Sequence, residues 1–207
     1  MRKFLALAAT VILGGALLIA GCGNDNNKQA ASDSKQVLKI GATAVPHAEI
    51  LEQVKPILAK EGIELKITEF TDYNTPNLAL GDKEIDANFF QHVPYMDEFA
   101  KSHKLNLVSA GGVHLEPMGL YSRQIKDLKD LPKGAKIAIP NDPTNGGRAL
   151  LLLQKQGLIT LKDSSNILST VQDITSNPND YQFVELEAAQ VPRSLDDVAL
   201  EIGRAHV

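Results

Sequence analysis

The spacing of apolar residues changes along the chain in a regular order, which predicts alternating strands and helices. Residues 37–42 form a short β-rich run, and residues 63–70 alternate apolar and polar side chains as a half-buried strand does. Between them, Pro46 opens a stretch of helical spacing that Gly62 ends. The same pattern then predicts helix 74–80, strand 85–90, helix 93–102 and strand 105–113. This is the element order of an open, mostly parallel α/β sheet, which binds ligands beyond the carboxyl ends of its strands.

The pattern restarts after Gly112, which indicates a second lobe. Residues 116–122 are extended, and residues 124–132 form a polar connector with a short helical turn. Beyond it we predict strand 135–140, a turn and helix over 141–157, strands 166–174 and 181–187, and a helix with Ser194 as its N-cap. We therefore predict an α/β fold of two lobes, 37–121 and 122–200, which meet at a ligand-binding cleft.

The N-terminus has the layout of a bacterial export signal. Residues 1–3 are basic, an apolar run of 17 residues follows, and "IAGC" ends it. This resembles a lipobox, so we predict a signal peptide over 1–21, a lipid on Cys22 and a flexible polar tether over 22–36. The alternative is a retained transmembrane helix, for which the run is short.

The C-terminus has an unusual composition. Residues 201–207, "EIGRAHV", are what a common sequencing adapter would encode in this frame. We expect them to be read-through from an incomplete gene, with no functional role for Arg204 or His206, and the second lobe to be incomplete. The alternative is a genuine tail in which Gly203 ends a helix.

Composition excludes several classes of function. The net charge is −4 and no basic patch is interleaved with aromatic residues, so nucleic acid is not an expected partner. Cys22 is the single cysteine, which excludes disulfides and cysteine-rich metal sites. There is no Gly-x-Ser-x-Gly motif, and no glycine pair precedes Lys-Ser/Thr, so we expect neither an enzyme nor a bound cofactor.

Histidines are the remaining candidate metal ligands. No pair of them has tight ligand spacing such as His-x-x-x-His, so we expect no metal site. The candidates weighed were His47, His92, His103 and His114, with Glu49 or Glu116 as additional ligands.

Aromatic residues are concentrated in one place. The chain has six Phe, four Tyr and no Trp, and six of these ten rings lie within residues 70–99. Phe90, His92 and Tyr95 follow a predicted strand, where they can line an apolar pocket with polar groups at its rim. The alternative is that Phe89 and Phe90 are core residues and His92 is a hydrogen-bonded loop residue.

Arg148 is the most specific candidate for ligand binding. It is one of five arginines and lies near the start of a predicted helix, after Gly146 and Gly147. The glycines are expected to let a ligand approach the backbone, and the helix N-terminus favours an anion. A guanidinium there can bind a carboxylate through two hydrogen bonds. The alternative is a solvated arginine, although that position opposes the helix dipole.

Three long motifs support these assignments. "DANFFQHVPY", "PNDPTNGGRALLLLQ" and "VELEAAQVPRSLDD", together with "DYNTPNLAL", resemble the methionine-binding lipoproteins of the MetQ/NlpA family, and the resemblance extends from Val37 to Leu200. It implies a two-lobed periplasmic-binding fold, similar to type II, anchored by a lipid to the membrane on its extracytoplasmic or periplasmic side. It also implies delivery of L- or D-methionine to an ABC permease driven by an ATPase.

The resemblance also implies which residues contact the ligand. Tyr73, Phe90, His92 and Tyr95 are expected on the thioether side, and Arg148 on the carboxylate with Asn145 beside it. Aromatic faces suit a polarizable thioether. Phe89 is expected to point the other way, because neighbouring strand residues alternate faces. The alternatives left open are another apolar amino acid or short peptide as ligand, a lipid-anchored enzyme, and an adhesive lipoprotein.

Overall fold

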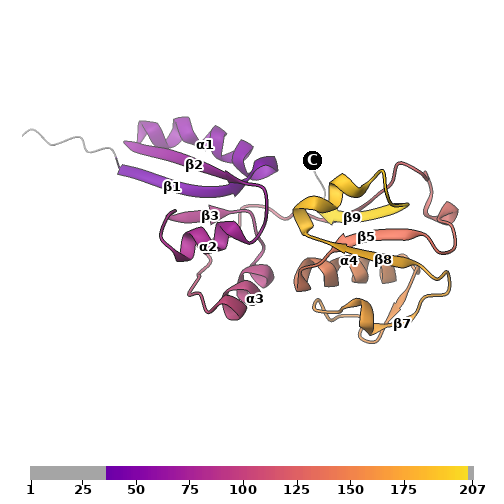
Figure 1. Ribbon diagram of the computed structural model, residues 1–207. Coiled ribbons are helices and arrows are strands. Elements are labelled where there is room, and N and C mark those ends of the chain that lie inside the picture. The colour runs from indigo at the N-terminus through magenta and orange to yellow at the C-terminus, as the bar shows by residue number, and fades with distance from the viewer. Residues whose placement is uncertain (1–35, 205–207) are drawn as a thin grey trace, which may run out of the picture. The chain divides into compact units, whose positions relative to one another are not determined.

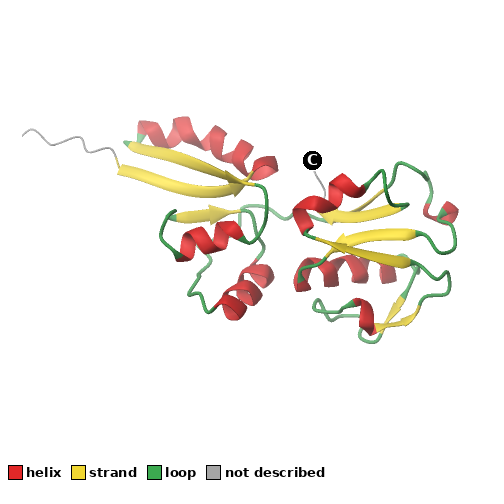
Figure 2. Ribbon diagram, in the orientation of Figure 1, coloured by secondary structure: helices red, strands yellow, loops and turns green. Residues whose placement is uncertain are grey.

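The computed structural model describes residues 36–204 (Figure 1). The predicted signal peptide, the predicted lipidation of Cys22, residues 22–35 of the predicted tether and residues 205–207 therefore lie outside the described residues, while Gln36 is part of a strand. Within residues 36–204, no helix combines the length and the apolar composition that a bilayer-spanning helix needs. Helices and strands alternate along the described chain, as the sequence predicts (Figure 2).

The first sheet has three parallel strands in the order β2-β1-β3. Its strands are β1 (Gln36–Thr43), β2 (Ile63–Phe70) and β3 (Ala87–Phe89). The helices that follow them are α1 (Glu49–Lys60), α2 (Thr75–Gly81) and α3 (Val93–His103), and the turn η1 (Ala44–Ala48) leads into α1. These six elements confirm six of the seven helices and strands predicted before residue 114.

The helical spacing of α1 explains how it packs on this sheet. Leu51, one turn into the helix, is buried with Ala48 against Ala42 of β1 and Leu65 of β2. Phe89 packs on the same cluster, whereas Phe90 is buried in a separate cluster of rings. The expected opposite orientation of these two neighbours is thus confirmed.

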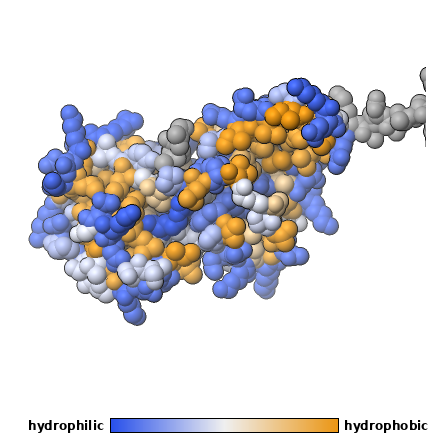
Figure 3. Space-filling view, turned by 180° about the vertical axis from the view of Figure 1, so that it is seen from behind, coloured by the Kyte–Doolittle hydropathy of each residue, from blue (hydrophilic) through white to orange (hydrophobic). Residues whose placement is uncertain are grey.

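The predicted strand over 105–113 is wrong. Residues 105–117 have no regular secondary structure, and Val108, Val113 and Leu115 are 83%, 69% and 82% exposed. An apolar run becomes a strand only where a sheet edge can pair with its backbone, and β3 is too short to offer one. The face of the molecule seen in Figure 3 carries hydrophobic patches beside hydrophilic ones.

The second sheet has four strands in the order β4-β9-β5-β8. They are β4 (Met118–Tyr121), β5 (Lys136–Pro140), β8 (Gln182–Leu186) and β9 (Leu200–Arg204). The central strand β5 is parallel to β8 and β9, and β4 is antiparallel to β9. Because β4 joins this sheet, the second sheet begins at Met118 and not after residue 121.

Helix α4 (Pro143–Lys155) packs on this sheet through Leu150 and Leu153, which are fully buried against Ile137 and Ile139 of β5. The smaller elements of this lobe are η2 (Leu128–Asp130), β6 (Thr160–Leu161), η3 (Val171–Asp173), β7 (Ile174–Ser176) and η4 (Ala188–Ser194). The two-lobed α/β fold is confirmed, as are the short helical turn, strands 135–140 and 181–187, and the helix after the turn at 141–142.

Two predictions in the second lobe are wrong. Residues 166–174 are mostly loop and 3-10 turn, and only Ile174 belongs to a strand. The helix expected from Ser194 does not form: η4 ends there, and residues 200–204 form β9 between β4 and β5. A short run of buried apolar residues fits either element, and here the backbone hydrogen bonds of two neighbouring strands select the strand. The origin of residues 201–207 stays a prediction.

Candidate functional site

The candidate site residues lie just beyond the carboxyl ends of four strands, three in the first sheet and β5 in the second. His47 follows β1, Tyr73 follows β2, Phe90 and His92 follow β3, and the turn that starts α4 follows β5. Carboxyl ends of parallel strands meet at one edge of a sheet, where α/β proteins bind ligands. A cavity of about 850 Å³ lies there, lined by residues of the first lobe together with Arg148 and Arg204 of the second.

Four rings form a buried cluster beside this cavity. Tyr73, Phe90, Tyr95 and Phe99 are each less than 10% exposed, and the ring centroids of Phe90 lie 5.9 Å from Tyr73 and 6.0 Å from Tyr95. The hydroxyl of Tyr95 donates to the carbonyl oxygen of Tyr73 at 2.9 Å. Burial raises the pKa of Tyr95, so this hydroxyl stays protonated and able to donate. Spacings of this kind are typical of edge-to-face packing, and they fix the position of Phe90.

Side-chain amides hold the turn after β3. Asn77 of α2 is fully buried; it donates to Gln91 at 2.8 Å and accepts from Gln91 at 2.7 Å and from Asn88 at 2.8 Å. Such a hydrogen-bonded network satisfies groups whose burial would otherwise be costly, and it positions the backbone that leads to His92. Sequence reasoning missed this network, although its residues lie within two of the quoted motifs.

His92 presents a polar atom without a partner. Its Nε2 is buried and makes no hydrogen bond within the described residues. Burial, and then the positive charge of Arg148, lower the pKa of His92 to about 4, so the ring is neutral at pH 7. A neutral imidazole can donate or accept one hydrogen bond at Nε2, and a buried atom left without one is a candidate for ligand contact.

Arg148 is held in place on α4. Asp142, the N-cap of the helix, accepts from the Asn145 backbone at 2.9 Å and from its side chain at 3.0 Å. Asn145 in turn accepts from Arg148 Nη1 at 3.1 Å, and Arg148 Nη2 donates to the carbonyl oxygen of Glu116 at 2.7 Å. This chain of hydrogen bonds orients the guanidinium, and a fixed orientation favours bidentate recognition of a carboxylate.

The glycine pair before Arg148 has a different role from the one expected. A Cβ atom on Gly146 would lie 2.8 Å from the carbonyl oxygen of Pro140, and one on Gly147 only 1.9 Å from that of Ile167. The glycines therefore let α4 pack closely on its own lobe. The expectation that they leave room for a ligand is wrong.

Three of the six predicted ligand-binding residues line the cavity, namely Phe90, His92 and Arg148. The other three are not among its lining residues and are buried behind them: Tyr73 and Tyr95 in the ring cluster, Asn145 beneath Arg148.

Arg204 is an unexpected neighbour of this site. It pairs with Glu116 at 2.6 Å, donates to the carbonyl oxygen of Phe90 at 2.6 Å and to the Tyr73 hydroxyl, and lies over the Tyr73 ring. No sequence signal indicated these contacts.

The candidate metal ligands separate into two groups. Three side chains gather despite their wide spacing in sequence, those of His47, His114 and Glu116. The others do not join them: His103 stacks on Phe99 and Glu49 is exposed.

The chain is similar to known proteins over nearly all of its length. The family model described as NlpA lipoprotein matches residues 38–207. The probable D-methionine-binding lipoprotein MetQ of Vibrio cholerae is 45% identical over 207 residues, which is 98% of this chain and 72% of the relative. The D-methionine-binding lipoprotein MetQ of Escherichia coli K12 is 42% identical over 202 residues, 97% of this chain and 72% of the relative.

Solved structures of similar proteins share its fold. A nutrient-binding protein from Burkholderia cenocepacia bound to methionine is 46% identical with a TM-score of 0.78, covering 82% of this chain and 72% of that one. A periplasmic substrate-binding protein of an ABC transporter from Coxiella burnetii is 45% identical with a TM-score of 0.77 and the same coverage.

Proposed function

The chain belongs to the NlpA lipoprotein family, and we propose from this premise that it captures methionine for an ABC importer. The proposal has the chain anchored to a membrane by a lipid on Cys22, on the extracytoplasmic side. It then delivers its ligand to a permease coupled to an ATPase. The names of the relatives are those of binding proteins, which supports binding without catalysis.

The observation that carries the proposal is that one cavity is lined by both a cationic and an aromatic side chain. Arg148 offers an oriented cation, and Phe90 offers a rigid aromatic face. A free amino acid with an apolar side chain needs both: its carboxylate pairs with the guanidinium, and its side chain packs on the ring. A thioether gains a further ~0.3–1.5 kcal/mol from such a face, which favours methionine over leucine.

We assign the remaining residues supporting roles. His92 Nε2 is the candidate hydrogen-bond partner for a polar atom of the ligand. Tyr73 and Tyr95 keep Phe90 in place, and Asn145 keeps Arg148 in place. These roles follow from burial and hydrogen bonding, and mutagenesis can test each of them.

Thermal unfolding with added ligands tests the function. A ligand that binds only the folded state raises Tm by mass action, so L- or D-methionine should raise it, while equal concentrations of leucine or histidine should have little effect. Calorimetric titration then gives the affinity. A cooperative melt that no form of methionine shifts, while leucine or a short peptide does, would replace methionine with that ligand.

A pair of arginine variants tests the site. Arg148→Gln should weaken methionine binding by roughly 10²–10⁴-fold, the equivalent of two charge-assisted hydrogen bonds of ~1.5–3 kcal/mol each. Arg123→Gln is the matched control, because Arg123 is exposed and pairs with the exposed Asp196, away from the cavity. Equal affinities of the two variants would refute the role of Arg148.

The lipid anchor has its own test. Cys22→Ser should move the protein from the membrane fraction to the soluble fraction and abolish incorporation of labelled palmitate. Retention of Cys22→Ser in the membrane would favour an uncleaved transmembrane helix instead.

A further inference from the structure

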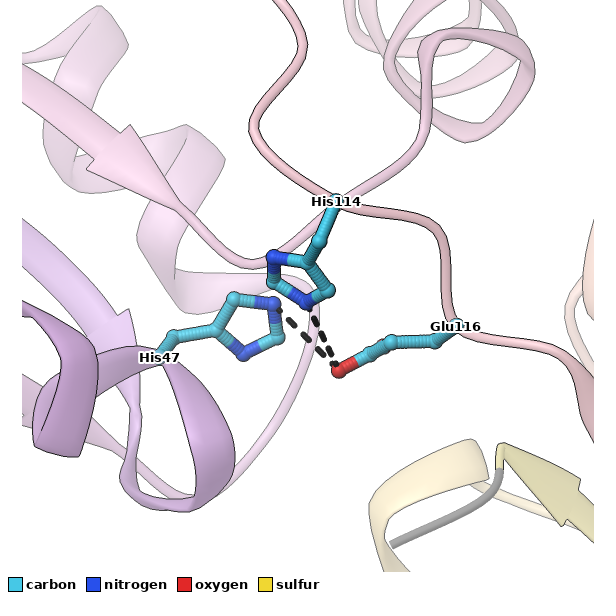
Figure 4. Close-up of side chains that lie close together, drawn as sticks. All are labelled: His47, His114 and Glu116. Carbon is cyan, nitrogen blue, oxygen red and sulfur yellow. Dashed lines mark hydrogen bonds and ion pairs between the residues drawn. The ribbon is translucent and has the colours of Figure 1, made fainter. Parts of the chain in front are cut away.

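We propose that His47, His114 and Glu116 form a binding site for a divalent transition-metal ion of the zinc type. The three side chains come from two segments: His47 from the turn that opens α1, and His114 and Glu116 from the stretch without regular secondary structure before β4 (Figure 4). A metal bound there would fasten this stretch to the first lobe. His47, His114 and Glu116 line the same cavity as Phe90, His92 and Arg148, but they are not among the groups proposed to hold methionine.

The distances between the ligand atoms suit a tetrahedral ion. His47 Nε2 and His114 Nε2 lie 3.6 Å and 3.4 Å from the same oxygen, Glu116 Oε1. Ligands at about 2.0–2.2 Å from zinc are separated by about 3.3–3.5 Å along the edges of the tetrahedron. All three ligand atoms lie within 4.8 Å of one another, and a small movement of the more exposed His114 brings the two nitrogens together.

His47 is oriented as metal-binding histidines are. Its Nδ1 lies 2.7 Å from Thr43 Oγ1, and Phe89 packs edge-on against the ring at 4.7 Å. When Nδ1 donates to the threonine hydroxyl, the lone pair of Nε2 faces Glu116 Oε1. A second polar partner that fixes ring and tautomer is a regular feature of metal sites. In that tautomer, an ion placed between Nε2 and Oε1 would be bound by both atoms.

The two histidines differ in their surroundings. His47 is 3% exposed and is held by Thr43 and Phe89, whereas His114 lies on an exposed stretch. The two carboxylate oxygens of Glu116 have different partners. Oε2 pairs with Arg204, and Oε1 faces the histidines and is available to bind the ion.

The donor set indicates which ions fit. Two imidazole nitrogens and one carboxylate oxygen suit zinc, copper, nickel and cobalt, whereas calcium and magnesium prefer oxygen ligands alone. Three protein ligands leave a fourth position for water, as in other open zinc sites. The carbonyl of Glu116 accepts from Arg148, so a metal on its side chain would also steady that contact.

Titration of the metal-free protein with zinc chloride tests the site. After treatment with EDTA and dialysis, calorimetry should show one zinc ion per chain, and cobalt(II) should give the intense visible absorption of a tetrahedral complex. His114→Gln should weaken zinc binding by about tenfold or more and remove the cobalt band. Thr43→Val should weaken binding by about 10–100-fold through loss of the outer hydrogen bond.

His103→Gln is the matched control, because His103 is exposed and stacks on Phe99 away from the cluster. It should bind zinc as the unchanged protein does. His114 is the variant of choice, since it lies on an exposed segment and its loss leaves the core intact, whereas His47 is buried. The proposal is overturned if the unchanged protein takes up no zinc, or if His114→Gln and His103→Gln bind it equally well.

Discussion

Replacing Gly147 by alanine tests how α4 is seated and therefore how Arg148 is positioned. The new Cβ would lie 1.9 Å from the carbonyl oxygen of Ile167 and 2.5 Å from its carbon. Ordinary contact begins near 3.4 Å, so the helix and the 163–169 loop must separate by about 1.5 Å. The loop resists this movement, because Asp163 and Asn166 accept backbone hydrogen bonds within it at 2.9 Å and 3.0 Å.

The expected change in the free energy of unfolding of Gly147→Ala follows from two opposing effects. Overpacking costs about 1–3 kcal/mol, and alanine in a helix regains up to about 1 kcal/mol relative to glycine. The net loss of about 1–2 kcal/mol lowers Tm by roughly 2–8 °C for a chain of this size. Methionine affinity should fall as well, because Arg148 lies on the next position of the helix.

Thermal or urea denaturation measures the loss. Gly112→Ala is the matched control, because a Cβ there meets nothing within 4 Å and its φ lies outside the left-handed region. Its stability should stay within about 0.5 kcal/mol of the unchanged protein. A Gly147→Ala protein that melts at or above the Tm of the control would refute the close approach of α4 to Ile167.

Three further predictions concern the supports of the site. Tyr95→Phe keeps the ring but leaves the carbonyl of Tyr73 without its donor, so urea denaturation should show a loss of about 1–2 kcal/mol; no loss would mean that water or another group replaces the hydroxyl. Asp142→Ala removes the N-cap of α4 and should cost about 1 kcal/mol while also weakening methionine binding through Asn145; Asp127→Ala, an N-cap remote from the cavity, should leave affinity unchanged. His92 has its pKa lowered from 6.5 to about 4, so the unfolded chain binds a proton that the folded chain does not, and stability should fall as pH drops from about 6.5 to 4. Urea midpoints across this range should depend less on pH in His92→Gln, and an unchanged dependence would contradict the buried neutral ring.

Local patterns in the sequence were sufficient for most of the first lobe. Alternation over 63–70 and helical spacing after Pro46 predict β2 and α1, because each of these segments buries one regular face. The concentration of aromatic rings around Phe90, and an arginine at position 148 in a chain with few arginines, predict two residues that line the cavity. Sequence can indicate them because the chemical properties of a side chain do not depend on the fold.

Tertiary structure decided which apolar runs pair as strands. Residues 105–113 resemble a strand but pair with neither edge of the β2-β1-β3 sheet, whereas residues 200–204 lie between β4 and β5 and become a strand. A strand exists only through hydrogen bonds to distant residues, so its own sequence cannot establish it.

Tertiary structure also decided which distant side chains act together. The sequence shows a Gly-Gly pair, but only the packing of α4 reveals that Ile167 requires it. His47 lies far from His114 and Glu116 along the chain, and their spacing predicted no metal site, yet folding brings their ligand atoms within 4.8 Å. The sequence by itself determined which side chains and which local helices and strands are available, because side-chain type and the spacing of apolar residues are properties of short segments. The fold alone determined the meeting of groups far apart in sequence, because that depends on how complete strands and helices pack.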